Sequence, residues 1–231
     1  MILETPIENL KYVGKIYQPK LKKLGIKTIK DLLWHFPMRY DDWTESGKVE
    51  DVKPNEKISL IGKVVDIENK RIFPRRIVLT RASIEDETGK INAVWYNQPF
   101  LVSTIKPGKL ISLSGKVKLD KYGVYLQNPA YEMVKSEIQN DKLRHTAGLI
   151  PIYPETEGLT SRYLRFLIKP LLKFSGRVPE FLPKEILERQ KLYDVKTALN
   201  EIHFPSSLEK ADQARKRFAF DELFLLQLKA L

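Results

Sequence analysis

Hydrophobic positions recur at helical spacing in the first part of the 231-residue chain. Over residues 6–36 apolar side chains return about every three to four positions, and glycines interrupt the pattern. Gly25 suits a left-handed helix end after the segment KLKKL, and Thr28 with Asp31 has the spacing of a capping box. We therefore expect short helices here, the last of which ends before Pro37.

Alternation with a period of two replaces this pattern between residues 56 and 134. Turn signals separate runs that are rich in strand-forming residues, at 56–69, 76–86, 90–97, 110–119 and 122–134. Five strands in about 80 residues, with a short insert between the third and the fourth, predict an OB-fold β-barrel. Such a barrel binds ligands on the face of its second and third strands and through its 1–2 and 4–5 loops.

Helical patterns return in the last part of the chain. Residues 145–158 are rich in Pro and Gly and are expected to form an ordered connector before an amphipathic helix over 159–174. Asp194 begins a short helix, and Ser206 or Ser207 begins a long one. The long helix is apolar around most of its circumference and needs a covering partner, which favours a chain that is the front part of a longer protein.

These patterns predict an α+β chain in three segments. Residues 1–52 form a helical region, 53–135 form the five-stranded OB-fold β-barrel, and 136–231 form a connector with helices. The first segment has the alternation of glycines and helices typical of a helix–hairpin–helix, which directs backbone N–H groups at phosphates. A purely structural role explains that alternation equally well.

The balance of charge favours a polyanionic partner, because the formal net charge is +11. Most of the excess lies in the middle segment, where residues 53–135 carry 15 Lys and Arg against 8 Asp and Glu. The chain has no cysteine, which excludes disulfides and thiolate sites and suits a reducing cytoplasm. No apolar run approaches the ~18 residues of a membrane span, so we expect no membrane contact.

Three aromatic residues lie at the end of the third predicted strand and in the connection after it: Trp95, Tyr96 and Phe100. Trp95 is in phase with the apolar positions of its strand, which favours the barrel core, whereas Tyr96 has the opposite parity and Phe100 follows a proline. Flat rings beside positive loops are typical of proteins that hold unpaired bases and follow a phosphate backbone. All three are candidate DNA-binding residues, with core packing as the alternative, favoured for Trp95.

Basic and aromatic residues also gather in the two loops that an OB-fold uses for binding. The loops are Lys70–Arg76 and Lys118–Tyr122, and their candidate contacts are Arg71, Phe73, Arg75, Arg76, Lys118, Lys121 and Tyr122. A solvated surface is the usual explanation of a charge run. The position of these runs in binding loops favours contact with nucleic acid, and Phe73 would be unusual in an exposed loop without a function.

Signals for catalysis are missing from the sequence. No GxxxxGK[ST] phosphate-binding loop is present, and SGK at Ser114–Lys116 lacks the upstream glycine. His35, His145 and His203 are scattered and form no ligand pair, and His203 is expected to pack or to cap a helix. We therefore expect no catalytic residue, no cofactor site and no metal site in this chain.

Four blocks resemble, in order, the N-terminal part of the RecG family of bacterial DNA helicases: LKKLGIKTIKDLLWHFPMRYDD, GLIPIYPETEGLTSRYLR, ALNEIHFP and ARKRFAFDELFLLQL. The resemblance covers essentially the whole chain. It implies a leading helical region, an OB-like wedge domain at 53–135 that splits strands at a fork, and a connector to RecA-like motor domains. By position, the family's stacking pair corresponds to Tyr96 and Phe100, or to Trp95 and Tyr96.

The resemblance also implies the partners. They are branched DNA with single-stranded regions, such as a replication fork or a Holliday junction in recombination and repair, and motor domains of the same polypeptide. ATP and Mg²⁺ would bind only to those motor domains, and the protein would be a monomer in the bacterial cytoplasm, at the nucleoid. Two alternatives stay open: an independent OB-fold protein that binds single strands or tRNA, and a module that docks a protein through its apolar C-terminal helix.

Overall fold

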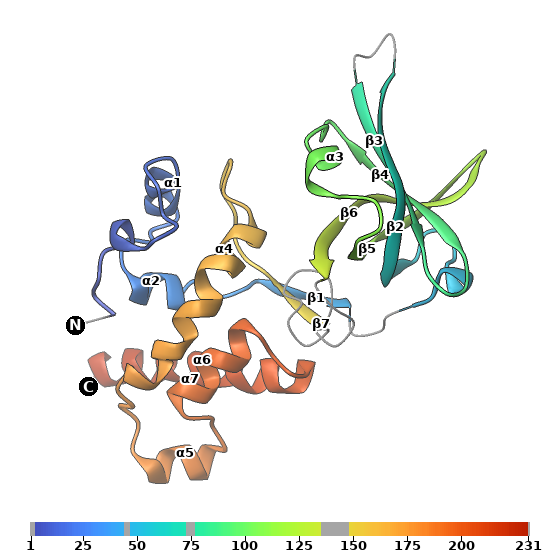
Figure 1. Ribbon diagram of the computed structural model, residues 1–231. Helices are drawn as coiled ribbons and strands as arrows, with labels where there is room; N and C mark the ends of the chain where they lie inside the picture. Colours follow the sequence, from blue (N-terminus) through green and yellow to red (C-terminus); the bar gives the residue numbers. More distant parts are fainter. Residues whose placement is uncertain (1–2, 44–46, 73–76, 135–147, 231) are drawn as a thin grey trace. The chain divides into compact units, whose positions relative to one another are not determined.

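The computed structural model groups the chain into two compact units. Unit 1 comprises Met1–Asp41 with Pro151–Leu231, and unit 2 comprises Asp42–Ile150. Unit 1 is mostly helical, and unit 2 holds a β-barrel (Figure 1). The division of the sequence at residues 52 and 135 stays a prediction. The residues that the structure describes are 3–43, 47–72, 77–134 and 148–230.

Unit 2 is built around a closed barrel of five strands (Figure 1). The strands are β2 (Lys57–Ile72), β3 (Ile77–Glu85), β4 (Lys90–Tyr96), β5 (Leu110–Asp120) and β6 (Gly123–Val134). They close in the order β2-β3-β4-β6-β5, with β4 and β6 parallel and the other pairs antiparallel. The 3-10 helix η2 (Val49–Asp51) precedes the barrel, and the short helix α3 (Leu101–Thr104) joins β4 to β5. The predicted OB-like barrel is confirmed.

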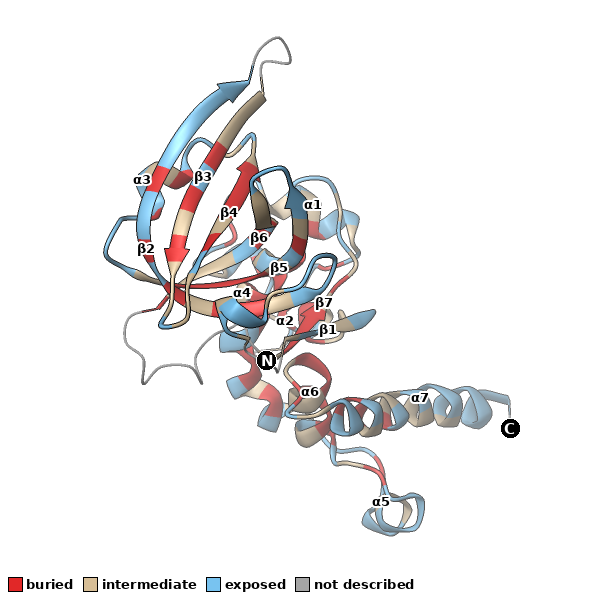
Figure 2. Cartoon of the chain, turned by 90° about the vertical axis from the view of Figure 1, so that its right-hand side faces the viewer, coloured by how far each residue is buried: buried red, intermediate tan, exposed pale blue. Residues whose placement is uncertain are grey.

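The barrel core follows the alternation of the sequence, as the buried bands along the strands show (Figure 2). On β4 the buried, inward positions are Ile91, Ala93 and Trp95. Gly62 lies where β2 passes from pairing with β5 to pairing with β3, and a Cβ there would lie 2.6 Å from Cγ2 of Ile84. Glycine therefore allows β2 to bend at this corner of the barrel.

Unit 1 packs elements from both ends of the chain around a shared core (Figure 1). Its helices are η1 (Ile7–Asn9), α1 (Gln18–Lys23), α2 (Ile29–Leu33), α4 (Ser161–Ile168), η4 (Lys169–Arg177), α5 (Lys184–Gln190), α6 (Val195–His203) and α7 (Leu208–Ala230). The predicted capping box is confirmed, because Thr28 Oγ1 accepts from the Asp31 amide and the Asp31 carboxylate accepts from the Thr28 amide. Gly25 has a φ of +79°, as expected for the left-handed end of α1.

Three local elements differ from the prediction. The expected helix over 159–174 continues as the 3-10 helix η4 after Ile168, because Pro170 lacks the N–H for an α-helical bond. Helix α5 forms directly after Pro183, in a segment for which no element was predicted. Two strands, β1 (Arg39–Trp43) and β7 (Gly148–Ile152), pair in a small sheet of their own.

His203 is a packed residue of unit 1, as predicted, and is fully buried. Its Nε2 lies 2.8 Å from the carbonyl oxygen of Leu33, and its Nδ1 lies 2.8 Å from the hydroxyl of Tyr153. Because a carbonyl only accepts, the ring carries its hydrogen on Nε2 and accepts from Tyr153 on Nδ1. Burial lowers the pKa of His203 to about 4, so the ring is neutral near pH 7.

Candidate nucleic-acid interface

The parity of β4 sends Trp95 and Tyr96 to opposite faces of the barrel. Trp95 is 1% exposed, and its indole Nε1 donates 2.8 Å to the carbonyl oxygen of Pro129 on β6. Because its ring is enclosed in the core, Trp95 is not available to stack on a base, and its place among the candidate DNA-binding residues is corrected. Tyr96 is partly exposed on the outer face and remains a candidate.

A groove of about 600 Å³ lies on the outer face of the barrel around Tyr96. It is lined by residues of β2, β3, β4 and β6 and of the turn between β5 and β6. In the order of the barrel strands along the chain, β3 and β4 are the second and third strands, which form the face where an OB-fold places its ligand. The lining adds the end of β2 and the turn between β5 and β6. Of the sequence candidates, the groove brings together Tyr96, Arg71, Lys121 and Tyr122.

Tyrosine rings supply the flat surfaces of the groove. Tyr96 and Tyr125 both line it, and their hydroxyl groups interact. Partial burial, followed by the nearby Tyr96 hydroxyl, raises the pKa of Tyr125, so the Tyr125 phenol is neutral near pH 7. Tyr122 is 76% exposed in the turn after β5. Neutral aromatic faces at a groove wall are suited to base stacking.

Cations surround these rings. The groove lining includes four cationic side chains, which are Lys70, Arg71, Arg81 and Lys121. It also includes the carboxylates of Glu68 and Asp120. Arg81 Nε donates 3.2 Å to Oδ1 of Asn92, which orients its guanidinium across the outer face of β3 and β4. Lys121 Nζ lies 4.9 Å from the ring centre of Tyr122. The Asp120 carboxylate accepts from the Tyr122 amide at 2.7 Å and so shapes the turn.

Phe100 lies outside the lining of this groove, at the start of α3. The residue is 57% exposed, which is unusual for a phenylalanine beside a barrel core. The connection that carries it is tied to the barrel, because Asn69 on β2 donates to Pro99 O and the buried Thr80 on β3 donates to Gln98 O. Phe100 is therefore exposed on a fixed backbone.

The other residues that the sequence predicted to contact DNA lie outside the groove lining or outside the described residues. Phe73, Arg75 and Arg76 lie outside the described residues. Lys118 is partly exposed on β5 opposite Tyr125 of β6, and it is not part of the groove lining. Sequence reasoning missed Arg81 and Tyr125, although each has the outward parity of its strand and that signal could have found them.

The described residues include no group of three or more His, Cys, Asp or Glu side chains that would hold a metal ion. The described helices likewise include none that is both long and apolar enough to cross a membrane. The groove can stack planar rings and attract phosphates.

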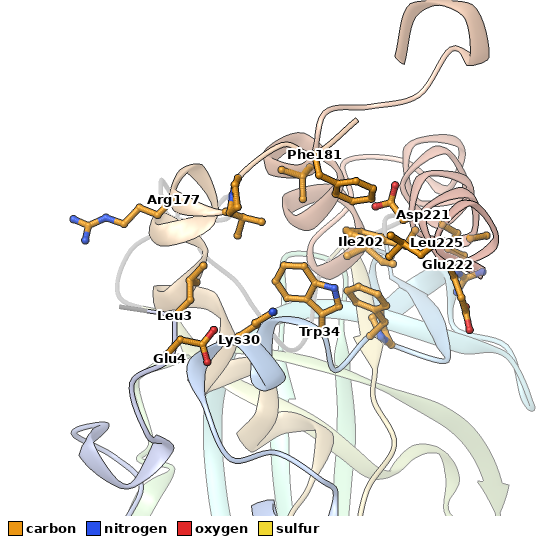
Figure 3. Close-up of a pocket in the computed structure, with 18 residues that line it drawn as sticks. Leu3, Glu4, Lys30, Trp34, Arg177, Phe181, Ile202, Asp221, Glu222 and Leu225 are labelled. Carbon is orange, nitrogen blue, oxygen red and sulfur yellow. The ribbon is translucent and has the colours of Figure 1, made fainter. Parts of the chain in front are cut away.

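A larger cavity of about 930 Å³ lies within unit 1 (Figure 3). Its walls are mainly apolar and include Trp34, Phe181 and Leu225, while Arg177 extends away from the aromatic side chains (Figure 3). It contains none of the candidate DNA-binding residues. This cavity therefore does not belong to the groove on the barrel.

An OB-like barrel with tyrosines and cations on its ligand-binding face defines a module of the nucleic-acid-binding class. The family model described as the RecG wedge domain matches residues 6–174. The chain belongs to this family.

The curated relatives are named ATP-dependent DNA helicase RecG. The chain is 36% identical to the one from Thermotoga maritima over 229 residues, which is 98% of this chain and 28% of that protein. It is 30% identical to the one from Bacillus subtilis over 98% of this chain and 32% of that protein. A solved structure of RecG bound to a three-way DNA junction matches 99% of this chain and 31% of its own chain, with a TM-score of 0.80 and 32% identity. The chain thus spans less than a third of the length of these relatives.

Proposed function

We propose that this chain binds branched DNA that contains single-stranded regions and acts as the wedge of a RecG-like helicase in recombination and repair. The observation that carries the proposal is the similarity over 99% of the chain to RecG bound to a three-way DNA junction. The groove supports it independently, because tyrosines and cations line the face that OB-like barrels use for nucleic acid.

The finer part of the proposal assigns the residues. Tyr96 stacks on an unpaired base in the groove, and Phe100, exposed at the start of α3, stacks on a second base where the strands part. Arg71, Lys118, Lys121 and Tyr122 hold the backbone near the groove, and Phe73, Arg75 and Arg76 are proposed to extend that contact. Phosphate contacts position the strands without reading their sequence.

ATP hydrolysis is assigned to another part of the helicase. The relatives are named ATP-dependent, and this chain lacks the glycine-rich loop and lysine that cradle phosphates. We infer that ATP, Mg²⁺ and the motor domains belong to the portion of the relatives that the chain does not span, and that the protein is a monomer in the bacterial cytoplasm, at the nucleoid. The purified chain should release no phosphate from ATP with or without DNA, and DNA-stimulated release would contradict this assignment.

DNA binding is tested with three labelled substrates: a fork, a blunt duplex of the same arms and a single strand. Fluorescence anisotropy over a series of salt concentrations should show the tightest binding to the fork. The log–log slope should rise by about 0.9 for each duplex phosphate contacted, or about 0.7 on a single strand. Equal affinity for fork and blunt duplex would contradict the wedge, and preference for the single strand alone would favour an independent OB-fold protein.

A further inference from the structure

Unit 1 contains a cationic cavity formed by η4 and α6. It has a volume of about 380 Å³ and is lined by Lys169, Leu172, Lys173, Ser175, Gly176, Lys196 and Asn200. Three of these seven residues are lysines and none is acidic. The described residues of unit 1 thus include a pocket with a strongly positive lining, and none of its residues is among those proposed above to contact DNA.

Helical geometry brings the polar side chains together. Lys196 and Asn200 are four residues apart on α6 and therefore share a face of that helix. Lys169 and Lys173 lie on η4, which packs against α6, and both line the cavity. The ammonium of Lys169 lies 4.0 Å from the ring centre of Phe204, and that of Lys173 lies 4.9 Å from the ring centre of Phe174. These rings stabilise the position of both cations.

A buried hydroxyl completes the lining. Ser175 is 1% exposed, and its Oγ accepts a hydrogen bond of 3.0 Å from Nδ2 of Asn200. Nδ2 of Asn200 also donates 2.7 Å to the carbonyl oxygen of Lys196, which fixes the amide plane. A serine hydroxyl can donate one hydrogen as well as accept, and within the described residues the hydrogen of Ser175 has no acceptor. The cavity therefore offers a preformed donor beside its ammonium groups.

We propose that this cavity binds a phosphate group, either as a diester in a DNA strand or as free phosphate. Lysine ammonium groups are point charges that bind phosphate through several donors, and a buried hydroxyl donor suits a phosphate oxygen. Neither Lys173 nor Lys196 has a described acidic partner at salt-bridge distance, so their charge is not cancelled locally. The DNA source rests on the proposed function, whereas the phosphate site itself does not.

The first measurement uses the whole chain with Lys173→Ala and Lys196→Ala combined. Anisotropy with a labelled blunt duplex of about 20 base pairs should show weaker binding and a log–log salt slope smaller by up to about 1.8, since two lysine contacts are lost. The control, Lys184→Ala with Lys210→Ala, removes the same charge from α5 and α7 outside the cavity. Both pairs are exposed, so both proteins should keep the melting temperature of the wild type.

The second measurement titrates inorganic phosphate and follows the backbone amide signals of Ser175, Gly176 and Lys196 by NMR. They should shift saturably in the wild type and in the control, and not in the lysine pair variant. Ser175→Ala retains all three lysines and should weaken phosphate binding, which a diffuse charge effect would not do.

The two arms distinguish the sources. If the lysine pair variant loses both duplex affinity and the phosphate-dependent amide shifts, the ligand is a phosphate of the DNA backbone. If it loses only the amide shifts and binds the duplex like the wild type, the ligand is free phosphate. Unchanged duplex slope and absent phosphate shifts in the wild type would overturn the proposal. Single-strand binding by Tyr96→Ala, measured in parallel, reports on the groove of unit 2, so failure of the lysine site and failure of the wedge are separable.

Discussion

The indole nitrogen of Trp95 donates a 2.8 Å hydrogen bond to the carbonyl oxygen of Pro129. The neighbouring residue of each strand makes a second link, because the Tyr96 amide donates 3.0 Å to Oδ1 of Asn128. These two bonds hold the end of β4 against β6 with the Trp95 ring inside the barrel. The register that buries Trp95 is the register that presents Tyr96 to the groove.

Removal of the Trp95 side chain should destabilise unit 2. Trp95→Ala should lower the free energy of unfolding by about 3–5 kcal/mol, because it leaves a cavity and an unpaired Pro129 carbonyl. Urea unfolding monitored by circular dichroism measures this change. Tyr96→Ala, next to it on the outer face, is the matched comparison and should cost less than about 1 kcal/mol. Equal losses in the two variants would contradict the opposite placement of the rings.

Phe100 should affect DNA binding and not stability. Phe100→Ala should leave the melting temperature nearly unchanged, because the ring is mostly exposed, and should weaken fork binding about 5- to 150-fold through the loss of one stacked base. Val65→Ala removes another exposed apolar side chain of unit 2, outside the groove lining and outside both predicted binding loops, and serves as the control. If both variants bind the fork like the wild type, Phe100 does not stack.

Local rules in the sequence account for much of this structure. The period-two alternation predicted the five strands of the barrel, and the parity of Trp95 correctly favoured the core because it depends only on neighbouring positions. The capping residue Thr28 fixed the start of α2 in the same local way.

Features that depend on distant pairing were not predictable in this way. The β1–β7 sheet joins segments more than a hundred residues apart, and neither strand alternates strongly enough to be recognised alone. Arg81 and Tyr125 enter the groove only because β3 and β6 both flank β4 in the closed barrel. Strand order, rather than any local motif, completes the site.

The buried imidazole of His203 should make unit 1 less stable in acid. The unfolded ring takes up a proton below about pH 6.5, whereas the folded ring has a pKa of about 4, so the free energy of unfolding falls as the pH decreases between these values. From pH 7 to pH 4.5 the wild type should lose about 2 kcal/mol more than His203→Gln, which retains a donor and an acceptor but does not titrate. Parallel pH dependence in urea unfolding of the two proteins would show that His203 is not the cause.

The buried guanidinium of Arg217 should be a second stabilising centre of unit 1. It donates to Glu180 at 2.6 and 2.8 Å, to Asp221 at 2.8 Å and to Tyr193 O at 2.7 Å. Arg217→Ala removes the cationic partner of the Glu180 and Asp221 carboxylates and should cost about 3–5 kcal/mol in the free energy of unfolding. Lys210→Ala, an exposed change on the same helix, should cost less than about 0.5 kcal/mol. A small loss in Arg217→Ala would mean that solvent compensates the two carboxylates.

The affinity of Tyr96 variants for a fork tests the central claim most directly. The dissociation constant of a labelled fork is measured at one salt concentration for the wild type, Tyr96→Phe and Tyr96→Ala. Because stacking needs the ring and not the hydroxyl, Tyr96→Phe should bind within about twofold of the wild type, and Tyr96→Ala should bind about 5- to 150-fold more weakly. A folded Tyr96→Ala that binds the fork as tightly as the wild type would contradict the account.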